Sequence, residues 1–506
     1  MSLPGFKPGA PPIKRWVGSI PTRFRQKIVI LYTKLKSLVL KLLTIFIAFQ
    51  LFLNLPFGYT LISLQEEEKI GKEIIKELNS QVEFIQDIEL VAYINTIGHI
   101  LKIKGLDFSP FNFRFFLIKD DTFNAFSIPG GYIFLNSGIF NSIKSEDELA
   151  AIMAHEMAHN ICRHIAKRFE KMKRLQIATT AATIAALLLG GGKVGEAVGI
   201  TSSALAQTKL LAYSRADEEE ADRTGFQILT KAGYNPWGMV NIMERLSKQS
   251  NFAIELNYRY LIDHPLPPER LNYITILAEN YTTNKSPANI VCHEKEYFKR
   301  LCIKAQVLSK DPTDLVIKYR EELNIKDDPW KHYALAIALS QERFFKDALI
   351  EMKKALSELP AKPYFILDLA EIYFRSGNYF KALSVLEKIK SPSDSKYWYK
   401  KIYNLKLKYL KARIFTEIGD TYKAYTLFNE LKNSNILNTD PYFYFYFGRT
   451  ASEMNKLGEA HFYFGKYYEL KGDYKTAIYH YKKALSFLSK TDKMYKEVQK
   501  NLKNLK

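Results

Sequence analysis

The chain has 506 residues, of which 47% are apolar and 25% charged. This composition excludes a collagen-like or low-complexity chain, and the length predicts two or three globular domains. The formal net charge of +20 would suit a nucleic acid or an anionic membrane surface, but the lysines are spread along the chain and no nucleic-acid-binding motif accompanies them, so we expect no nucleic acid partner.

The first 60 residues predict an export signal. Residues 1–36 carry eight lysines and arginines, and the first acidic residue of the chain is Glu66. Residues 42–59, LLTIFIAFQLFLNLPFGY, follow as an uncharged apolar segment. The positive-inside bias keeps the basic end in the cytoplasm and exports the remainder. Because no cleavage site of small residues is evident, residues 1–60 are either a signal peptide with a long basic region or an uncleaved signal anchor; a buried core helix is the alternative.

Residues 61–280 combine helical and strand-like patterns. A Ser cap and an acidic first turn predict a helix from Ser63, and a second helix follows around residues 87–103. The segments FNFRFFLIKD and GGYIFLNSGIF predict strands, because they are rich in aromatic and β-branched residues. One long helix is expected from Ser145 through the sequence HEMAH, and another over residues 213–233. Residues 177–207 predict a buried helical hairpin, with a membrane-dipping or lid segment as the alternative.

The last part of the chain is repetitive. Residues 281–326 predict a polar linker followed by connecting helices. Beyond them Ala348 and Ala382 are 34 residues apart, which is the tetratricopeptide period. The segments GNYFKAL, GDTYKAY and GDYKTAI repeat one turn between helices. Residues 327–506 therefore predict an all-α solenoid of about four tetratricopeptide repeats, whose concave face usually binds a peptide or partner. A helical bundle with chance periodicity is the alternative.

The sequence HEMAH has the spacing of a metal site. On a helix His155 and His159 share one face and can reach one metal ion, while Glu156 can contact a water molecule there without being a ligand. His164 lies about 180° round a continuous helix from His155. We therefore expect His164 to pack or to contact the helix end, and Cys162 to be a core thiol.

A third ligand is needed, and the segment YSRADEEEADRTG offers one. Glu218 and Asp222 share a helical face, so that Glu218 could bind the metal and Asp222 could accept the free N–H of a ligating histidine. A solvated acidic face is the alternative, since runs of four acids are usually solvated. The residues alone leave this choice open.

A family resemblance adds to this reading. HEMAH, RADEEEADR, LQEEEKIGKEI and NAFSIPGGYIFLNSGIF together resemble the CAAX-prenyl-protease-like zinc metallopeptidases, or gluzincins. The repetitive tail is similar to that of the periplasmic bacterial type. The resemblance runs from about residue 61 to the end. It implies an α+β zincin-like domain, mostly helical with a small sheet, over residues 61–280. It also implies one Zn²⁺ per chain, held by His155, His159 and Glu218, with Glu156 as general base and Asp222 orienting a ligand.

Two further site predictions rest on this resemblance. The segment Gly131, Tyr132, Ile133 and Phe134 is expected to be an edge strand that pairs with an extended substrate backbone; an ordinary core strand is the alternative. His264, in DHPLPPERL, is expected to stabilise the oxyanion or to occupy the open zinc position when no substrate is bound, and simple packing is the alternative.

The predicted function is a zinc-dependent endopeptidase, exported to the periplasm or anchored in the inner membrane facing it. The resemblance implies cleavage of extended or misfolded envelope polypeptides during quality control and assembly of outer-membrane proteins. The repeats would dock these substrates or an assembly machine, and membrane contact is possible. The rival function is a chaperone or scaffold whose zinc site is plugged or regulatory. Cys292 and Cys302 could pair in an oxidising compartment; buried free thiols are the alternative.

Overall fold

The computed structural model describes residues 62–174, 181–188, 213–249, 260–281, 294–360, 362–389 and 398–505. The predicted export signal over residues 1–60, Cys292 and most of the predicted hairpin over residues 177–207 lie outside them. In the described ranges no helix is both long and apolar enough to cross a membrane. Cys302 is a buried free thiol. The prediction of a mostly helical chain with a small sheet is confirmed.

Two capped helices open the described chain. Helix α2 (Leu64–Gln81) begins after Ser63, whose hydroxyl accepts the Glu66 N–H, as the sequence predicts. Helix α3 (Ile88–Gly105) begins after Asp87, whose carboxylate accepts two backbone N–H groups. Segment 82–86 between the helices adds one β-bridge, from Phe84 to Ile118, beside the sheet.

The sheet has three strands, β1 (Arg114–Ile118), β2 (Ala125–Ile128) and β3 (Tyr132–Asn136), in the order β1-β3-β2. Strand β3 pairs in parallel with β1 and antiparallel with β2. The prediction that residues 131–134 form an edge strand is therefore wrong, because both hydrogen-bonding sides of β3 are used. Gly130 and Gly131, at φ +89° and +81°, make the turn that folds β2 onto the outer side of β3. Strand β2 itself was not predicted.

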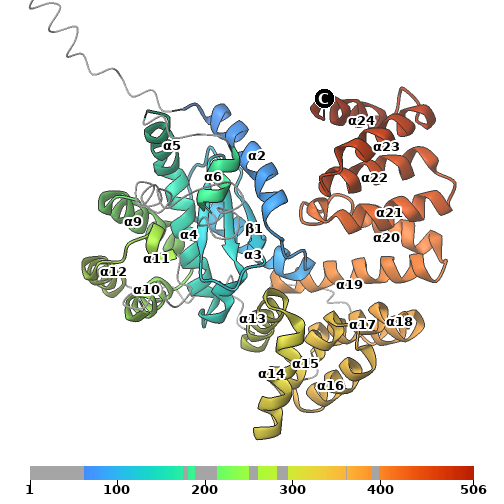
Figure 1. The fold of residues 1–506 in the computed structure, drawn as a ribbon, viewed down its shortest axis with the longest axis horizontal. Coiled ribbons are helices and arrows are strands. Elements are labelled where there is room, and N and C mark those ends of the chain that lie inside the picture. Colours follow the sequence, from blue (N-terminus) through green and yellow to red (C-terminus); the bar gives the residue numbers. More distant parts are fainter. Residues whose placement is uncertain are drawn as a thin grey trace, which may run out of the picture. The chain divides into compact units, whose positions relative to one another are not determined.

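Helix α4 (Glu146–Ile161) crosses behind the sheet and packs on β2, on α9 (Arg215–Lys231) and on α10 (Trp237–Gln249) (Figure 1). The predicted long helix from Ser145 is broken after Ile161. Arg163 has a φ of +57°, and a second helix, α5 (His164–Arg174), starts in a new direction. The remaining elements of this part are η2 (Ser137–Asn141), α6 (Ala181–Leu188), α11 (Tyr260–Asp263) and α12 (Pro268–Asn280).

The predicted connecting region is two helices, α13 (Lys295–Ser309) and α14 (Pro312–Ile325). Its hydrophobic residues belong to the same core as those of α3, α4 and the first repeat helices. Residues 62–506 thus form one compact unit, within which the predicted boundaries at residues 280 and 326 fall.

A buried ionic cluster lies at this junction. The Arg300 guanidinium donates to both carboxylate oxygens of Glu89 on α3, at 2.9 and 2.7 Å, and to Asp368 at 2.7 Å. Lys406 bridges the same two carboxylates from the far side. All four side chains are at most 4% exposed. The cluster therefore ties α3 to helices that lie more than 200 residues further along the chain.

The repeat helices follow one another and pack in consecutive pairs, α15 with α16, α17 with α18, α19 with α20 and α21 with α22 (Figure 1). Helix α23 packs on α22, so the last unit shares a helix with its predecessor. The repeated alanines, among them Ala348, Ala382 and Ala477, are buried, because small residues let paired helices approach. The bounds are α15 (Pro329–Gln341), α16 (Phe345–Glu358), α17 (Pro363–Arg375), α18 (Tyr379–Glu387), α19 (Trp398–Glu417), α20 (Thr421–Leu431), η4 (Leu437–Thr439), α21 (Pro441–Glu453), α22 (Leu457–Leu470), α23 (Tyr474–Phe487) and α24 (Lys493–Asn504).

Candidate metal centre

Helix α4 brings His155 and His159 to one buried face. Ser145 caps the helix, and three acidic residues occupy its first turn, where they complement the helix dipole. The Nε2 atoms of the two histidines lie 3.0 Å apart. The predicted pair of ligand residues therefore converges as the i, i+4 spacing requires.

Helix α9 places Glu218 and Asp222 against this pair. A capping box between Ser214 and Asp217 fixes where the helix begins. Gly225 allows the close approach of the two helices, because a Cβ atom there would lie 3.2 Å from the backbone of His155. Glu218 and Asp222 are buried, so the solvated-face alternative for these two acids does not hold.

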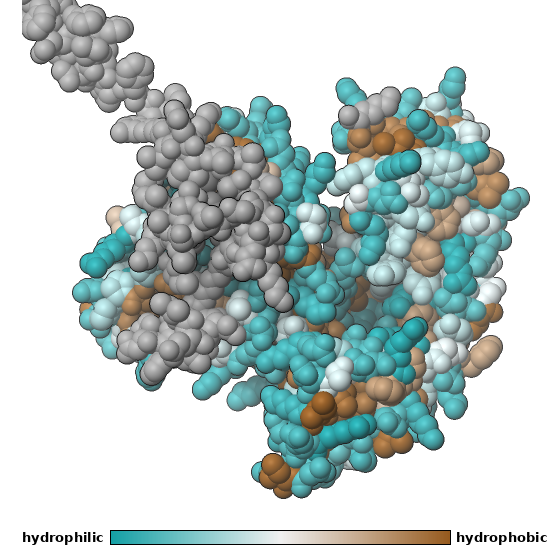
Figure 2. Space-filling view, viewed as in Figure 1, coloured by the Kyte–Doolittle hydropathy of each residue, from teal (hydrophilic) through white to brown (hydrophobic). Residues whose placement is uncertain are grey.

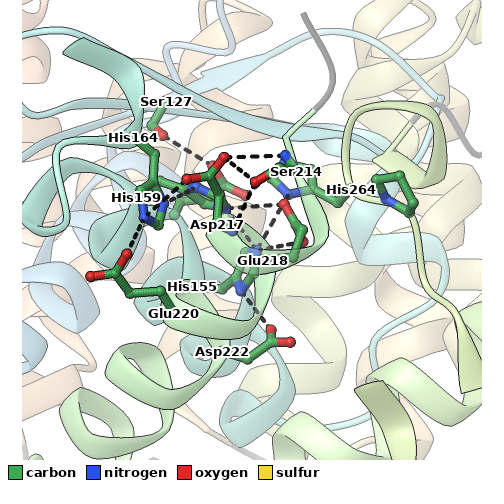
Figure 3. A network of polar contacts seen from close by, with 12 residues as sticks. Ser127, His155, His159, His164, Ser214, Asp217, Glu218, Glu220, Asp222 and His264 are labelled. Atoms are coloured by element: carbon green, nitrogen blue, oxygen red, sulfur yellow. Dashed lines mark hydrogen bonds and ion pairs between the residues drawn. The ribbon is translucent and has the colours of Figure 1, made fainter. Parts of the chain in front are cut away.

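His264 completes the cluster from the turn after α11. Its Nδ1 atom lies 3.3 Å from His155 Nε2 and 2.9 Å from Glu218 Oε1, and Tyr260 stacks on its ring with centroids 4.4 Å apart. Tyr213 stacks on the other side of the centre, against His159, at 3.8 Å. His264 is thus part of the site and not a distant packing residue (Figure 3).

These residues fit a metal ion. Three imidazole nitrogens and one carboxylate oxygen, all buried, lie within 4.8 Å of one another. A tetrahedral zinc ion with bonds of about 2.0–2.1 Å needs ligand atoms about 3.3 Å apart. With Oε1 of Glu218 as the carboxylate atom, four of the six separations are between 2.9 and 3.4 Å; His155 Nε2 lies 3.6 Å from the other oxygen, Oε2. The four side chains thus already form the shell that such an ion requires.

A second layer of contacts orients the ligands. Asp222 Oδ1 lies 3.0 Å from Nδ1 of His155, the nitrogen that faces away from the cluster, as predicted for an orienting carboxylate. Arg270 forms ion pairs with both Asp222 and Glu218, and the Tyr273 hydroxyl donates to Asp222. Sequence reasoning missed Arg270 and Tyr273, although Arg270 lies within the DHPLPPERL segment that drew attention to His264 and Tyr273 lies two residues after it.

The surroundings of His155 favour a positive charge at the centre. Burial alone would lower the pKa of its imidazole, but hydrogen bonds to Asp222 and Glu218 raise that pKa to about 10. Burial would likewise raise the pKa of Asp222, yet its contacts with His155 and Arg270 lower it below the ordinary value. A cation, whether a proton or a metal ion, is thus stabilised between these carboxylates.

Glu156 faces the same space without belonging to the ligand set. Ser127 on β2 donates to its Oε2 at 3.2 Å, while its Oε1 lies 3.5 Å from His264 Nε2 and has no hydrogen-bond partner among the described residues. Burial raises the pKa of this carboxyl group. Ser127 was missed because its strand was not predicted.

Two further residues, His164 and Cys162, lie near the centre. His164, which a continuous helix would point away, lies with its Nδ1 3.1 Å from Nδ1 of His159, because the chain turns at Arg163. Its Nε2 is 3.0 Å from Glu220. Cys162 lies outside the four-residue cluster, 3.4 Å from the Thr224 hydroxyl. It is only partly buried, so it is not the core thiol that the sequence predicted. The segment 131–134 does not reach the centre.

Comparisons with known proteins agree with this chemistry. Residues 92–278 match the model of peptidase family M48. The β-barrel assembly-enhancing protease of Yersinia pestis is 28% identical over 62% of this chain and 63% of that protein, and the Escherichia coli protein of that name is 27% identical over 75% and 76%. The mitochondrial metalloendopeptidase OMA1 of Schizosaccharomyces pombe is 30% identical over 37% and 53%.

One solved structure also matches part of the chain. The TPR domain of P58(IPK) is 17% identical, covers 73% of this chain and 94% of that chain, and has a TM-score of 0.16. The repeat architecture described above rests on the helix pairs of this chain and not on that match. The resemblance predicted from HEMAH and EEEAD is confirmed by the family match and by the named relatives.

Proposed function

We propose that this chain, whose residues 92–278 are a metallopeptidase domain of family M48, is a zinc-dependent endopeptidase of the cell envelope. The observation that carries the proposal is the near-tetrahedral arrangement of His155, His159, Glu218 and His264, with Glu156 beside it. His155, His159 and Glu218 would hold the ion. The protein would then have the two-histidine, one-glutamate donor set of catalytic zinc sites.

The residues of the chain supply proton transfer and orientation. A bound zinc ion would act as a Lewis acid on the scissile carbonyl and on a water molecule. Glu156 takes a proton from this water as its oxygen adds to the carbonyl carbon, and later gives the proton to the leaving amine nitrogen as the C–N bond breaks. Asp222 keeps the proton of His155 on Nδ1, so that Nε2 faces the metal.

His264 occupies the fourth vertex and would have to leave before a water molecule or a carbonyl could enter. Its position supports the plug role rather than a role in stabilising the oxyanion. It lies just after the four-residue helix α11, beside Pro265 and Pro267, so a small movement of this turn would open the centre. The enzyme would thus be held inactive until a substrate displaces His264.

An extended substrate would pair with β2 and not with β3. Strand β2 is at the end of the strand order, and among the described residues it pairs only with β3. Its Ser127 contacts Glu156 directly. A peptide added along β2 would therefore pass the catalytic base.

The substrates we propose are extended or misfolded envelope polypeptides, in quality control and assembly of outer-membrane proteins. This is supported by the names of the relatives, the predicted export signal and the repeat helices, which would dock substrates or an assembly machine. The experiment compares cleavage of an unfolded protein by wild type, Glu156→Gln and the control Glu219→Gln on the exposed face of α9. We expect Glu156→Gln to bind zinc and to lose about 10²- to 10⁴-fold in rate. Wild-type cleavage by Glu156→Gln would exclude this mechanism.

The second candidate function is a scaffold or chaperone whose zinc site is plugged. The observation that favours it is His264 at the fourth vertex. If Glu156→Gln restores a deletion strain as fully as wild type does, the scaffold function is the physiological one. Deleting residues 327–506 is a poor complementary test, because it also removes Asp368 and Lys406 from the buried ionic cluster.

A further inference from the structure

A large cavity lies between the peptidase part and the repeat helices. It has a volume of about 1080 Å³ and is lined by the end of α2, by segment 82–88 and by residues of α13, α15, α17, α19, α21 and α22. Figure 2 shows a hollow here with mainly hydrophilic walls. Most of its charged residues are already paired across the walls, as in Lys304 with Asp87 and Lys119 with Glu83.

Arg375 and Lys310 are different. Both are half-buried, line the cavity, and form no ion pair or side-chain hydrogen bond with any residue that the structure describes; Arg375 lies at the end of α17. The acid nearest to it in sequence, Glu371, is used by Arg413, whose Nη1 donates to it at 3.1 Å. Arg413 also has its Nε buried without a hydrogen-bond partner among the described residues. The carboxylate of Glu371 is therefore paired with Arg413 and not with Arg375.

The pKa of Arg375 agrees with the lack of a paired carboxylate. Burial, together with the positive charges of Arg413 and Arg343, outweighs Glu371 and lowers the pKa of the Arg375 guanidinium. An anion bound beside Arg375 would relieve both effects, since it would replace lost hydration and offset the like charges. The wall around Arg375 thus favours the binding of a negatively charged group.

We propose that this cavity binds an extended polypeptide through a carboxylate group held by Arg375. The planar guanidinium donates two parallel N–H groups, which match a carboxylate. A polyanion such as a nucleic acid does not fit, because Glu371, Asp440 and Glu469 also line the cavity. The exposed ring of Tyr442, which also lines the cavity, offers apolar surface for the rest of the segment.

The carboxylate could be the end of a polypeptide chain or an acidic side chain, and the two sources can be separated. The inference rests on the proposed role of the repeat helices in docking polypeptides. Binding is therefore measured by fluorescence polarisation with the full-length Glu156→Gln protein, so that a failure to bind and a failure to cleave are separate results. The probes are a labelled Gly-Ser-Gly-Ser-Tyr-Ile-Phe peptide with a free carboxyl end, its amide, and the amide with Asp in place of the second Ser.

The free acid, the Asp-containing amide, or both should bind, and the neutral amide should bind at least about tenfold more weakly. Arg375→Gln should weaken binding of the carboxylate peptides about 10- to 100-fold, and Arg375→Lys less, because it keeps the charge without the planar fork. Lys381→Gln, an equal loss of charge on exposed α18 away from the cavity, is the control. Equal binding of all three peptides, or unchanged binding by both Arg375 variants, would overturn the inference.

Discussion

His159 and His164 face each other through their Nδ1 atoms, which lie 3.1 Å apart. Two such nitrogens can share only one proton. If His159 holds a metal ion through Nε2, its proton is on Nδ1 and is donated to His164 Nδ1. His164 then carries its own proton on Nε2, which is 3.0 Å from Glu220. The chain His159–His164–Glu220 thus fixes the ring of one ligand, as Asp222 fixes that of His155.

This arrangement also bears on a second possible metal group. Cys162, His164 and Glu220 are close enough to hold an ion of their own. Such an ion would need the lone pair on Nε2 of His164. In the chain His159–His164–Glu220 that nitrogen carries a proton, so it has no free lone pair. If neutral His159 binds the first metal ion, neutral His164 therefore cannot bind a second one. The role that agrees with these contacts is that His164 orients the His159 ring.

The first prediction concerns this orientation. His164→Ala should weaken zinc binding about 10- to 100-fold, the usual effect of losing a group that orients a ligand. The measurement is a zinc titration against a competing chelator. His99→Ala, at an exposed position of α3, is the matched control and should bind as wild type does. Zinc affinity of His164→Ala equal to that of the control would show that the His164 contact is only packing.

What the sequence could predict depended on how local the pattern was. The i, i+4 pair His155 and His159 and the 34-residue spacing of Ala348 and Ala382 follow from periodicity within single elements, and the structure has both. The role of His164 was missed because neither Gly nor Pro marks the break in the helix. It is Arg163 that takes the left-handed conformation there.

The longer-range features were not visible in the sequence. Arg270 and Ser127 reach the centre from an element other than α4, and no spacing rule connects them to it. The partners Arg300 and Glu89 are separated by 211 residues. The edge position of β2 was likewise not visible, because no strand was predicted directly before the Gly130-Gly131 turn.

The second prediction tests the buried ionic cluster. Arg300→Met should lower the free energy of unfolding by about 3–5 kcal/mol, because Glu89 and Asp368 would remain buried with fewer positive partners. Urea unfolding followed by circular dichroism measures the change. Arg320→Met on α14, where the arginine is 57% exposed, is the control and should change stability by less than about 1 kcal/mol. A small effect of Arg300→Met would show that the junction does not depend on this cluster.

The third prediction is the pH dependence of the same cluster. Burial opposes ionisation of Glu89, but the charges of Arg300, Lys406 and Lys304 prevail and lower its pKa from 4.5 to about 2. Because the pKa is lower in the folded chain than in the unfolded chain, the stabilisation is complete above pH 4.5 and is lost as the pH falls towards 2. The stability difference between wild type and Glu89→Gln should be constant from pH 7 to 5 and shrink by about 2 kcal/mol at pH 3. A difference independent of pH over this range would contradict the low pKa.

The fourth prediction separates the two roles proposed for His264. If His264 is a plug, only the fraction of molecules in which it has left the fourth vertex can work, so removing it raises the rate by up to the inverse of that fraction. We expect His264→Ala to keep one zinc ion per chain, because His155, His159 and Glu218 remain, and to cleave an unfolded protein several-fold faster than wild type. Zinc content and initial cleavage rates are the two measurements.

The control for this variant is His264→Ala combined with Glu156→Gln, which should bind zinc and be inactive, since the faster cleavage must still need the base. A rate about 10²-fold below wild type for His264→Ala, with zinc retained, would contradict the plug and would assign His264 to stabilisation of the oxyanion. Loss of zinc from His264→Ala would instead make His264 an obligatory fourth ligand. In that case the centre would be closed to water and substrate, and the scaffold function would be favoured over the peptidase.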